Sequence, residues 1–183
     1  MKKTLCLILF IITLVFSNKS KAVTFYSGIG LGESKVKLDN QSLDDKRSFT
    51  FSLGSSFYIP LFPLRLEAEY QKFNSKKDSY DVNTYGTGIN TYINLPLLPI
   101  LVPYIGFGLA YLKEKNNSND ENLPRKSDGK IVPEYIIGLD LDLPTVVFAG
   151  SMEYRYINTN FEFENEKETS KYHIFLLKAR LKF

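Results

Sequence analysis

Alternation of side-chain type near the carboxyl end is the feature of this sequence that most constrains its fold. Every second residue from Phe175 to Phe183 is apolar or small, whereas Lys178, Arg180 and Lys182 between them are basic. Successive side chains of a β-strand point to opposite faces, so this segment has one apolar face and one basic face. A final strand of this kind, ending on an aromatic residue in a chain that begins with an export signal, predicts a transmembrane β-barrel.

The amino end has the organisation of a secretory leader. Lys2 and Lys3 precede an apolar run over residues 5–16. This run suits the apolar region of a signal peptide and is too short to span a bilayer as a helix. An uncleaved anchor is the alternative, and the length of the run argues against it.

Small residues after the apolar run place the cleavage site. Ser20 and Ala22 occupy the positions that a signal peptidase requires, so we expect cleavage after Ala22, with Ser17 as the weaker option. The sequence therefore predicts a leader over residues 1–22 and one barrel domain over residues 23–183.

The net charge of the chain depends on this leader. The full sequence has 23 Lys and Arg against 20 Asp and Glu, and four of the lysines precede residue 22, which leaves 19 basic residues afterwards. A nearly neutral exported chain does not have the basic surface of a nucleic-acid-binding protein. Cys6, the single cysteine, lies in the leader, so neither a disulfide nor a thiolate metal site is expected in the remainder.

About eight segments of the chain alternate in the same way. They are residues 23–34, 47–59, 64–73, 81–95, 103–113, 131–143, 145–157 and 173–183. In the third, for example, Leu66, Ala68 and Tyr70 alternate with charged or polar residues. An even number of strands predicts an all-β, antiparallel, up-and-down barrel.

The predicted connections fall into two kinds. Those at residues 59–63, 95–99 and 143–145 are short and contain proline, which ends strands because it lacks a backbone donor. The others, at residues 33–46, 74–80, 115–130 and 158–171, are longer and hydrophilic. Short turns at one end and long loops at the other are typical of a transmembrane barrel whose long loops face outside.

Two sets of side chains are predicted on opposite faces of the wall. An aromatic girdle is expected toward lipid, near the long-loop ends of the strands. It comprises Tyr70, Tyr85, Tyr111, Tyr135 and Tyr156. Charges of both signs are expected in the lumen, where a barrel of eight strands has little free space and opposite charges should pair. They are Arg65, Glu67, Glu69, Glu134, Asp140, Asp142, Glu153, Arg155, Lys178, Arg180 and Lys182.

Several segments resemble a known family, the small eight-stranded outer-membrane barrels of Gram-negative bacteria of the opacity-protein and OmpA type. The matching residues are 24–32, 65–70, 103–111 and 153–156 and the terminal strand, and the resemblance covers the whole chain after the leader. It implies an outer-membrane location and contact with outer-membrane lipid. It also implies that Phe175, Leu177, Leu181 and Phe183 form a signal for the barrel-assembly machinery. Lys178 and Leu181 depart from the family, which often has glycine and an aromatic residue there.

Candidate catalytic and metal sites are weak. His173, the only histidine, is predicted to face lipid, and the nearby Ser170 lacks the arrangement that lipid-modifying barrels use. Asp140 and Asp142 share a face, but three bases are expected at the same level, so ion pairing is favoured over cation binding. We therefore expect no enzyme activity, cofactor or metal.

The sequence leaves several functions open. We favour a surface antigen or adhesin-like barrel whose loops contact a host-cell or extracellular ligand, or a plain structural barrel, with a lumen plugged by salt bridges. A narrow porin-like channel is the alternative, and a lipid-modifying enzyme is the least favoured. A soluble ligand-binding barrel would need an apolar interior.

Overall fold

The computed structural model describes residues 23–38, 41–42, 46–57, 63–77, 80–95, 100–118, 129–142, 147–163 and 166–183. Their elements are all strands: β1 (Val23–Leu38), β2 (Gln41–Ser42), β3 (Lys46–Phe57), β4 (Leu64–Lys77), β5 (Tyr80–Asn94), β6 (Leu101–Ser118), β7 (Gly129–Asp142), β8 (Phe148–Phe163) and β9 (Glu166–Lys182). Within this part of the chain, no helix combines the length and the apolarity needed to cross a membrane. The predicted leader and Ala22 lie outside the described residues.

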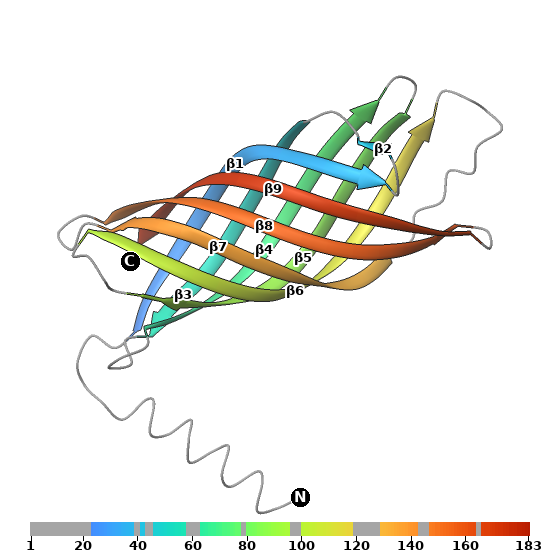
Figure 1. Ribbon diagram of the computed structural model, residues 1–183. Coiled ribbons are helices and arrows are strands. Elements are labelled where there is room, and N and C mark those ends of the chain that lie inside the picture. The colour runs from blue at the N-terminus through green and yellow to red at the C-terminus, as the bar shows by residue number, and fades with distance from the viewer. Residues whose placement is uncertain are drawn as a thin grey trace, which may run out of the picture.

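Eight long strands close into an antiparallel barrel (Figure 1). Each long strand pairs with the next long strand in sequence, and β1 pairs with β9 to close the sheet. Ile29, for example, lies opposite Phe51 on one side and Ala179 on the other. The two-residue β2 pairs only with the end of β1. The predicted all-β, up-and-down barrel of eight strands is confirmed.

The barrel has two distinct ends. Val23 and Phe183 lie at one of them, called the proximal end here, and β1, β4, β6 and β8 all run toward the other, the distal end (Figure 1). The backbone N–H of Phe183 donates to the Phe25 carbonyl over 2.9 Å, which fixes the carboxyl terminus against β1. The last residue is therefore part of the hydrogen-bonded wall.

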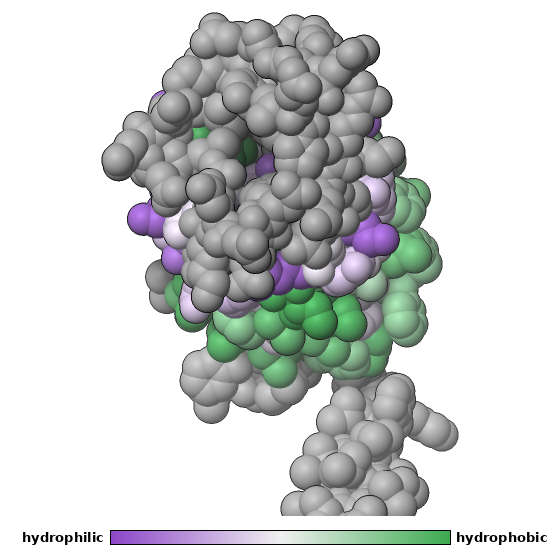
Figure 2. All heavy atoms as spheres, turned by 90° about the vertical axis from the view of Figure 1, so that its right-hand side faces the viewer, coloured by the Kyte–Doolittle hydropathy of each residue, from purple (hydrophilic) through white to green (hydrophobic). Residues whose placement is uncertain are grey.

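Alternation along the strands separates an apolar outer face from a polar interior. Outward side chains such as Ile89 and Ile131 are 67% and 69% exposed, whereas the inward side chains of Arg155 and Asn90 are fully buried. Exposed apolar residues, called the apolar band here, occur on the outer face of all eight long strands. On the side seen in Figure 2, hydrophobic residues lie next to hydrophilic ones that are closer to the distal end. Burial of such a band requires lipid, because soluble proteins rarely expose large contiguous apolar surfaces.

The predicted strand ends are wrong at the distal end, where the strands continue into the predicted loops. Residues 74–80 and 158–171 are mostly strand, and only residues 78–79 and 164–165 separate the paired strands there. The alternation inverts beyond the apolar band: Val36 is buried inside the barrel while Lys35 and Lys37 face outward. Hydrophilic residues on the outer face of a strand were thus mistaken for loop residues. At the proximal end the errors are small, since β3 stops at Phe57 and β8 begins at Phe148.

Candidate functional site

The interior of the barrel holds nine of the eleven predicted lumen charges, each at most 5% exposed. They are Arg65, Glu67, Glu69, Glu134, Asp140, Glu153, Arg155, Lys178 and Arg180. Lys182 has the same orientation on β9 but is half-buried near the proximal end. Asp142 belongs to β7, and its side chain lies outside the described part of the structure. Nine of the expected lumen charges are therefore buried inside the barrel, where they form two neighbouring groups.

Arg155 is the centre of this system. It forms a two-pronged ion pair with Glu69, in which Nη2 lies 2.8 Å from Glu69 Oε2 and Nη1 contacts the other oxygen. Its Nε contacts Glu153, and Nη1 lies 3.4 Å from Glu134 Oε2. The guanidinium fork suits several carboxylates at once because its five donors are held in one plane.

Lys178 supplies the second cation of this cluster. Its Nζ lies 2.5 Å from Glu67 and 2.8 Å from Glu69, so Glu69 is shared by Lys178 and Arg155. Four carboxylates thus surround two cations. Unpaired buried charge is costly, so further donors are needed to stabilise the carboxylates.

Neutral side chains provide those further donors. Tyr26 Oη donates to Glu67 over 3.0 Å, and Tyr104 Oη donates to Glu153 over 2.9 Å. The Gln71 amide donates to Glu134 over 2.5 Å. Each hydroxyl or amide places a partial positive charge at a carboxylate without adding a further ion.

A second group of charges lies on the proximal side of the first. Asp140 accepts from Arg65 over 2.7 Å and lies 2.8 Å from Arg180 Nη2. The Arg65 guanidinium also stacks over two aromatic rings, 4.1 Å from the centre of Tyr92 and 4.6 Å from that of Tyr104. Asp140 is therefore an ion-pair partner for two arginines, as the sequence favoured.

Three buried tyrosine rings each pack against a glycine of the neighbouring strand. Tyr26 lies opposite Gly54, Tyr104 opposite Gly138, and Tyr92 opposite Gly106. A Cβ on any of these glycines would overlap the facing ring. The sequence analysis did not single out these tyrosines, although a lumen-facing tyrosine with glycine at the directly paired position is a signal that could have found them.

An apolar layer fills the lumen on the distal side of the charges. It follows directly along the same strands, since Ile157 comes two residues after Arg155 and Leu176 two residues before Lys178. Its members are Val36, Phe73, Ala110, Leu112, Val132, Ile157, Tyr172, Ile174 and Leu176, none more than 2% exposed. Full burial of each large side chain contributes about 1.5–3 kcal/mol. The sequence analysis expected a polar lumen throughout and missed this layer.

The predicted girdle tyrosines all face outward. Tyr70, Tyr111 and Tyr135 are 41%, 44% and 53% exposed, and Tyr85 and Tyr156 are partly buried. Their strands continue for several residues beyond them, so the girdle marks the edge of the apolar band and not the ends of the strands. The predicted assembly-signal residues are Phe175, Leu177 and Leu181 on the outward face of β9 and Phe183 directly after it, and all four are exposed.

Ser170 and His173, considered above as a candidate catalytic pair, point to opposite faces of β9. His173 faces outward, where its Nδ1 lies 2.7 Å from Tyr154 Oη, whereas Ser170 is buried on the inward face. Among the residues that the structure describes, no group of three His, Cys, Asp or Glu side chains is placed to hold a metal ion.

A closed antiparallel barrel with an apolar outer band and a charged interior has the architecture of an outer-membrane β-barrel. Residues 4–183 match the outer membrane protein beta-barrel domain, and the chain belongs to this family. The protein is thus located in the outer membrane of a Gram-negative bacterium, as the sequence predicted. Comparison with curated protein sequences gives no significant match.

Solved structures agree with the fold. Neisserial surface protein A (NspA) is 17% identical with a TM-score of 0.68, and the match covers 89% of this chain and 100% of that one. The attachment invasion locus protein Ail of Yersinia pestis is 18% identical with a TM-score of 0.58, covering 90% of this chain and 100% of Ail. A major outer membrane protein from Thermus thermophilus is 13% identical with a TM-score of 0.54, covering 88% and 100%. These similarities establish the shared barrel architecture.

Proposed function

We propose that this protein is a surface-exposed barrel that binds an extracellular partner at its distal end and conducts no solute through its lumen. The observation that carries the proposal is the filled interior, in which an ion-paired layer and an apolar layer follow one another along the same strands. A barrel of this size has just enough room for its own side chains. With the lumen occupied, the exposed distal surface is where a specific interaction can take place.

The first step of the proposal concerns conduction. An ion crossing the lumen would have to pass Arg155, which bridges to Glu69, and then a layer of large apolar side chains. The polar group of this layer, the Tyr172 hydroxyl, is already in contact with Glu114 and Thr84. Moving an ion from water into such a layer is strongly unfavourable. The two layers therefore support a plug and argue against the narrow porin-like channel.

The second step concerns the distal surface. Lys37 lies directly opposite Lys171 across the β1–β9 pair, and Lys35 lies opposite His173. All three lysines are exposed. Like charges directly opposite each other destabilise a sheet, and a polyanionic partner would relieve this repulsion. A host-cell or extracellular polyanion is therefore the partner that this surface fits.

A related fold gives a practical probe for this partner. Ail has also been solved in complex with the heparin analogue sucrose octasulfate. Sulfated glycans are thus a suitable first class of ligand to test here, at the Lys37 and Lys171 surface.

The experiment is attachment of a non-adherent laboratory bacterium that displays this barrel to cultured animal cells. One variant carries Lys37→Gln with Lys171→Gln, and a second replaces residues 119–128 by a short turn. We expect the wild type to attach and one or both variants to lose attachment. If Lys37 and Lys171 bind the partner, free heparin should compete with attachment. The control is Lys72→Gln with Lys113→Gln, which removes the same charge from the opposite side of the barrel. Confirmed display without attachment would overturn the proposed function.

Two further parts of the proposal concern partners and catalysis. The exposed apolar face of β9 supports recognition of the terminal strand by the barrel-assembly machinery. The placement of Ser170 and His173 on opposite faces of β9 supports a protein without enzyme activity. Lipid hydrolysis by the purified wild-type barrel that disappears in His173→Ala would contradict this.

A further inference from the structure

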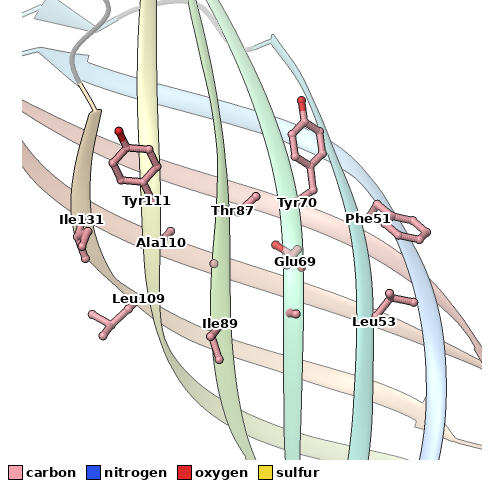
Figure 3. Close-up of a pocket in the computed structure, with 12 residues that line it drawn as sticks. Phe51, Leu53, Glu69, Tyr70, Thr87, Ile89, Leu109, Ala110, Tyr111 and Ile131 are labelled. Atoms are coloured by element: carbon pink, nitrogen blue, oxygen red, sulfur yellow. The ribbon is translucent and has the colours of Figure 1, made fainter.

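A groove runs across the outer face of the wall between β3 and β7. Its volume is about 590 Å³. The groove exists because Ala68 and Thr87, which are small, lie between larger outward side chains on the flanking strands. Figure 3 shows Tyr70 and Tyr111 on either side of Thr87, with both hydroxyls directed the same way along the barrel.

The groove continues toward the proximal end. A second hollow of about 470 Å³ shares Leu53, Ala68 and Ile89 with the first and extends to Phe25 and Phe183. The two hollows together follow the wall through most of the apolar band. Their walls are apolar and lie within the surface that faces lipid, so an extended acyl chain is the chemical group that fits them.

Two lysines stand at the distal edge of the groove. Lys72 lies opposite Tyr85, and Tyr85 lies opposite Lys113, so the three form one row across β4, β5 and β6. This row is two residues beyond Tyr70 and Tyr111, on the same outward face. Adjacent strands are about 4.8 Å apart, which puts the two lysine backbones roughly 10 Å from each other. Flexible lysine stems can close on a single phosphate from that separation.

The position of one lysine is supported by the wall around it. Lys113 Nζ lies 5.6 Å from the ring centre of Tyr111, and the Tyr111 hydroxyl lies over Gly129, where a Cβ would overlap it. Neither Lys72 nor Lys113 has an ion-pair partner among the described residues. Two positive charges at the end of an apolar groove are complementary to a lipid that carries a phosphate at the end of its acyl chains.

We propose that this groove binds one phosphate-bearing lipid of the outer leaflet, with an acyl chain along Ala68, Thr87 and Ile89 and its phosphate between Lys72 and Lys113. The site depends on the outer-membrane location and is independent of the proposed adhesive function. It lies on β4–β6, whereas the basic surface assigned to an extracellular partner lies on β1 and β9, on the other side of the closed sheet.

The test is native mass spectrometry of the full barrel, released from detergent after titration with phosphorylated lipid A or with its dephosphorylated form. Lys72→Gln with Lys113→Gln should weaken binding of the phosphorylated lipid about 25-fold, at roughly fivefold for each lysine. The same variant should bind the dephosphorylated lipid as the wild type does. Thr87→Leu, which fills the groove, should weaken binding of both lipids.

The matched control is Lys37→Gln with Lys171→Gln, which removes two outward charges from the distal part of β1 and β9, beyond the apolar band. We expect this control to bind phosphorylated lipid A within twofold of the wild type. Heat-modifiable gel mobility verifies that every variant is folded. The site is overturned if the Lys72 and Lys113 variant binds phosphorylated lipid A as the wild type does. It is also overturned if the control loses as much affinity, because equal losses would show that the lipid responds to surface charge in general. Unaltered binding in Thr87→Leu would overturn the groove as the acyl-chain site.

Discussion

Arg155 on β8 is joined to Glu69 on β4 by a two-pronged ion pair that crosses the whole lumen. The two residues are 86 apart in sequence, and their strands are four places apart in a closed ring of eight, so they come from opposite walls. A contact of this kind ties the two halves of the barrel together. It also occupies the space through which a solute would pass.

Removal of Arg155 tests the energetic role of this contact. Arg155→Ala leaves Glu69, Glu134 and Glu153 with less positive charge than the cluster requires, and breaking a buried ion pair from one side typically costs about 3–5 kcal/mol. The free energy of unfolding, measured by urea titration of the barrel in lipid vesicles, should fall by this amount. Arg155→Met combined with Glu69→Gln should recover part of the loss. The exposed Lys37→Ala is the control, and it should change the free energy of unfolding by no more than about 0.5 kcal/mol. A decrease in Arg155→Ala no larger than that of the control would contradict this role.

The packing of Tyr26 against Gly54 is tested by adding one methyl group at position 54. Gly54→Ala would push a Cβ into the Tyr26 ring, which must move away from Glu67, and overpacking of this kind costs about 1–3 kcal/mol. Gly150→Ala is the matched control, because a Cβ there has no atom within 4 Å. Urea titration should therefore separate the two variants. Equal stability of both would mean that the glycine at position 54 is not required by the tyrosine.

The apolar layer is tested by two neighbouring leucines on β9. Leu176 is fully buried in the lumen, whereas Leu177 is 56% exposed toward lipid. Leu176→Ala should destabilise the barrel by about 2–5 kcal/mol, since it leaves a cavity that the rigid wall cannot close. Leu177→Ala should cost less, because lipid chains fill the space that it vacates. Comparable losses of unfolding free energy in the two variants would argue against a packed interior.

Proteolytic processing is a separate prediction. Cleavage after Ala22 gives a chain that begins at Val23, the first residue of β1. Amino-terminal sequencing of the protein extracted from outer membranes should give Val-Thr-Phe-Tyr-Ser. Substitution of Ala22 by a bulky residue should lead to accumulation of the precursor, and an unchanged product in that variant would show that cleavage occurs elsewhere.

Most of the barrel could be predicted because its strands obey a simple two-residue period. The side chains from Leu64 to Gln71 alternate without exception, and each lies on the face that this alternation assigns. Lipid outside and a narrow polar lumen inside impose opposite requirements on the two faces, which makes the alternation strong. The same argument predicted the nine charged side chains that are buried in the interior.

The distal part of the barrel could not be predicted in this way, because its polarity is reversed. Lys35, Val36 and Lys37 alternate as clearly as the strands in the apolar band, but the apolar residue points inward. Hydrophilicity alone therefore suggested loops where the wall continues. The pairing of Tyr26 with Gly54 also needs the register between strands, which a single sequence does not supply.

Conductance of the purified barrel in a planar lipid bilayer tests the central claim of a filled, non-conducting lumen most directly. The ion-paired layer around Arg155 and the apolar layer around Leu176 predict no steady conductance by the wild type. A steady conductance whose size or ion selectivity changes in Arg155→Ala or Glu153→Ala would place the ion pathway through the charged cluster. That result would contradict the plug and establish the barrel as a narrow channel.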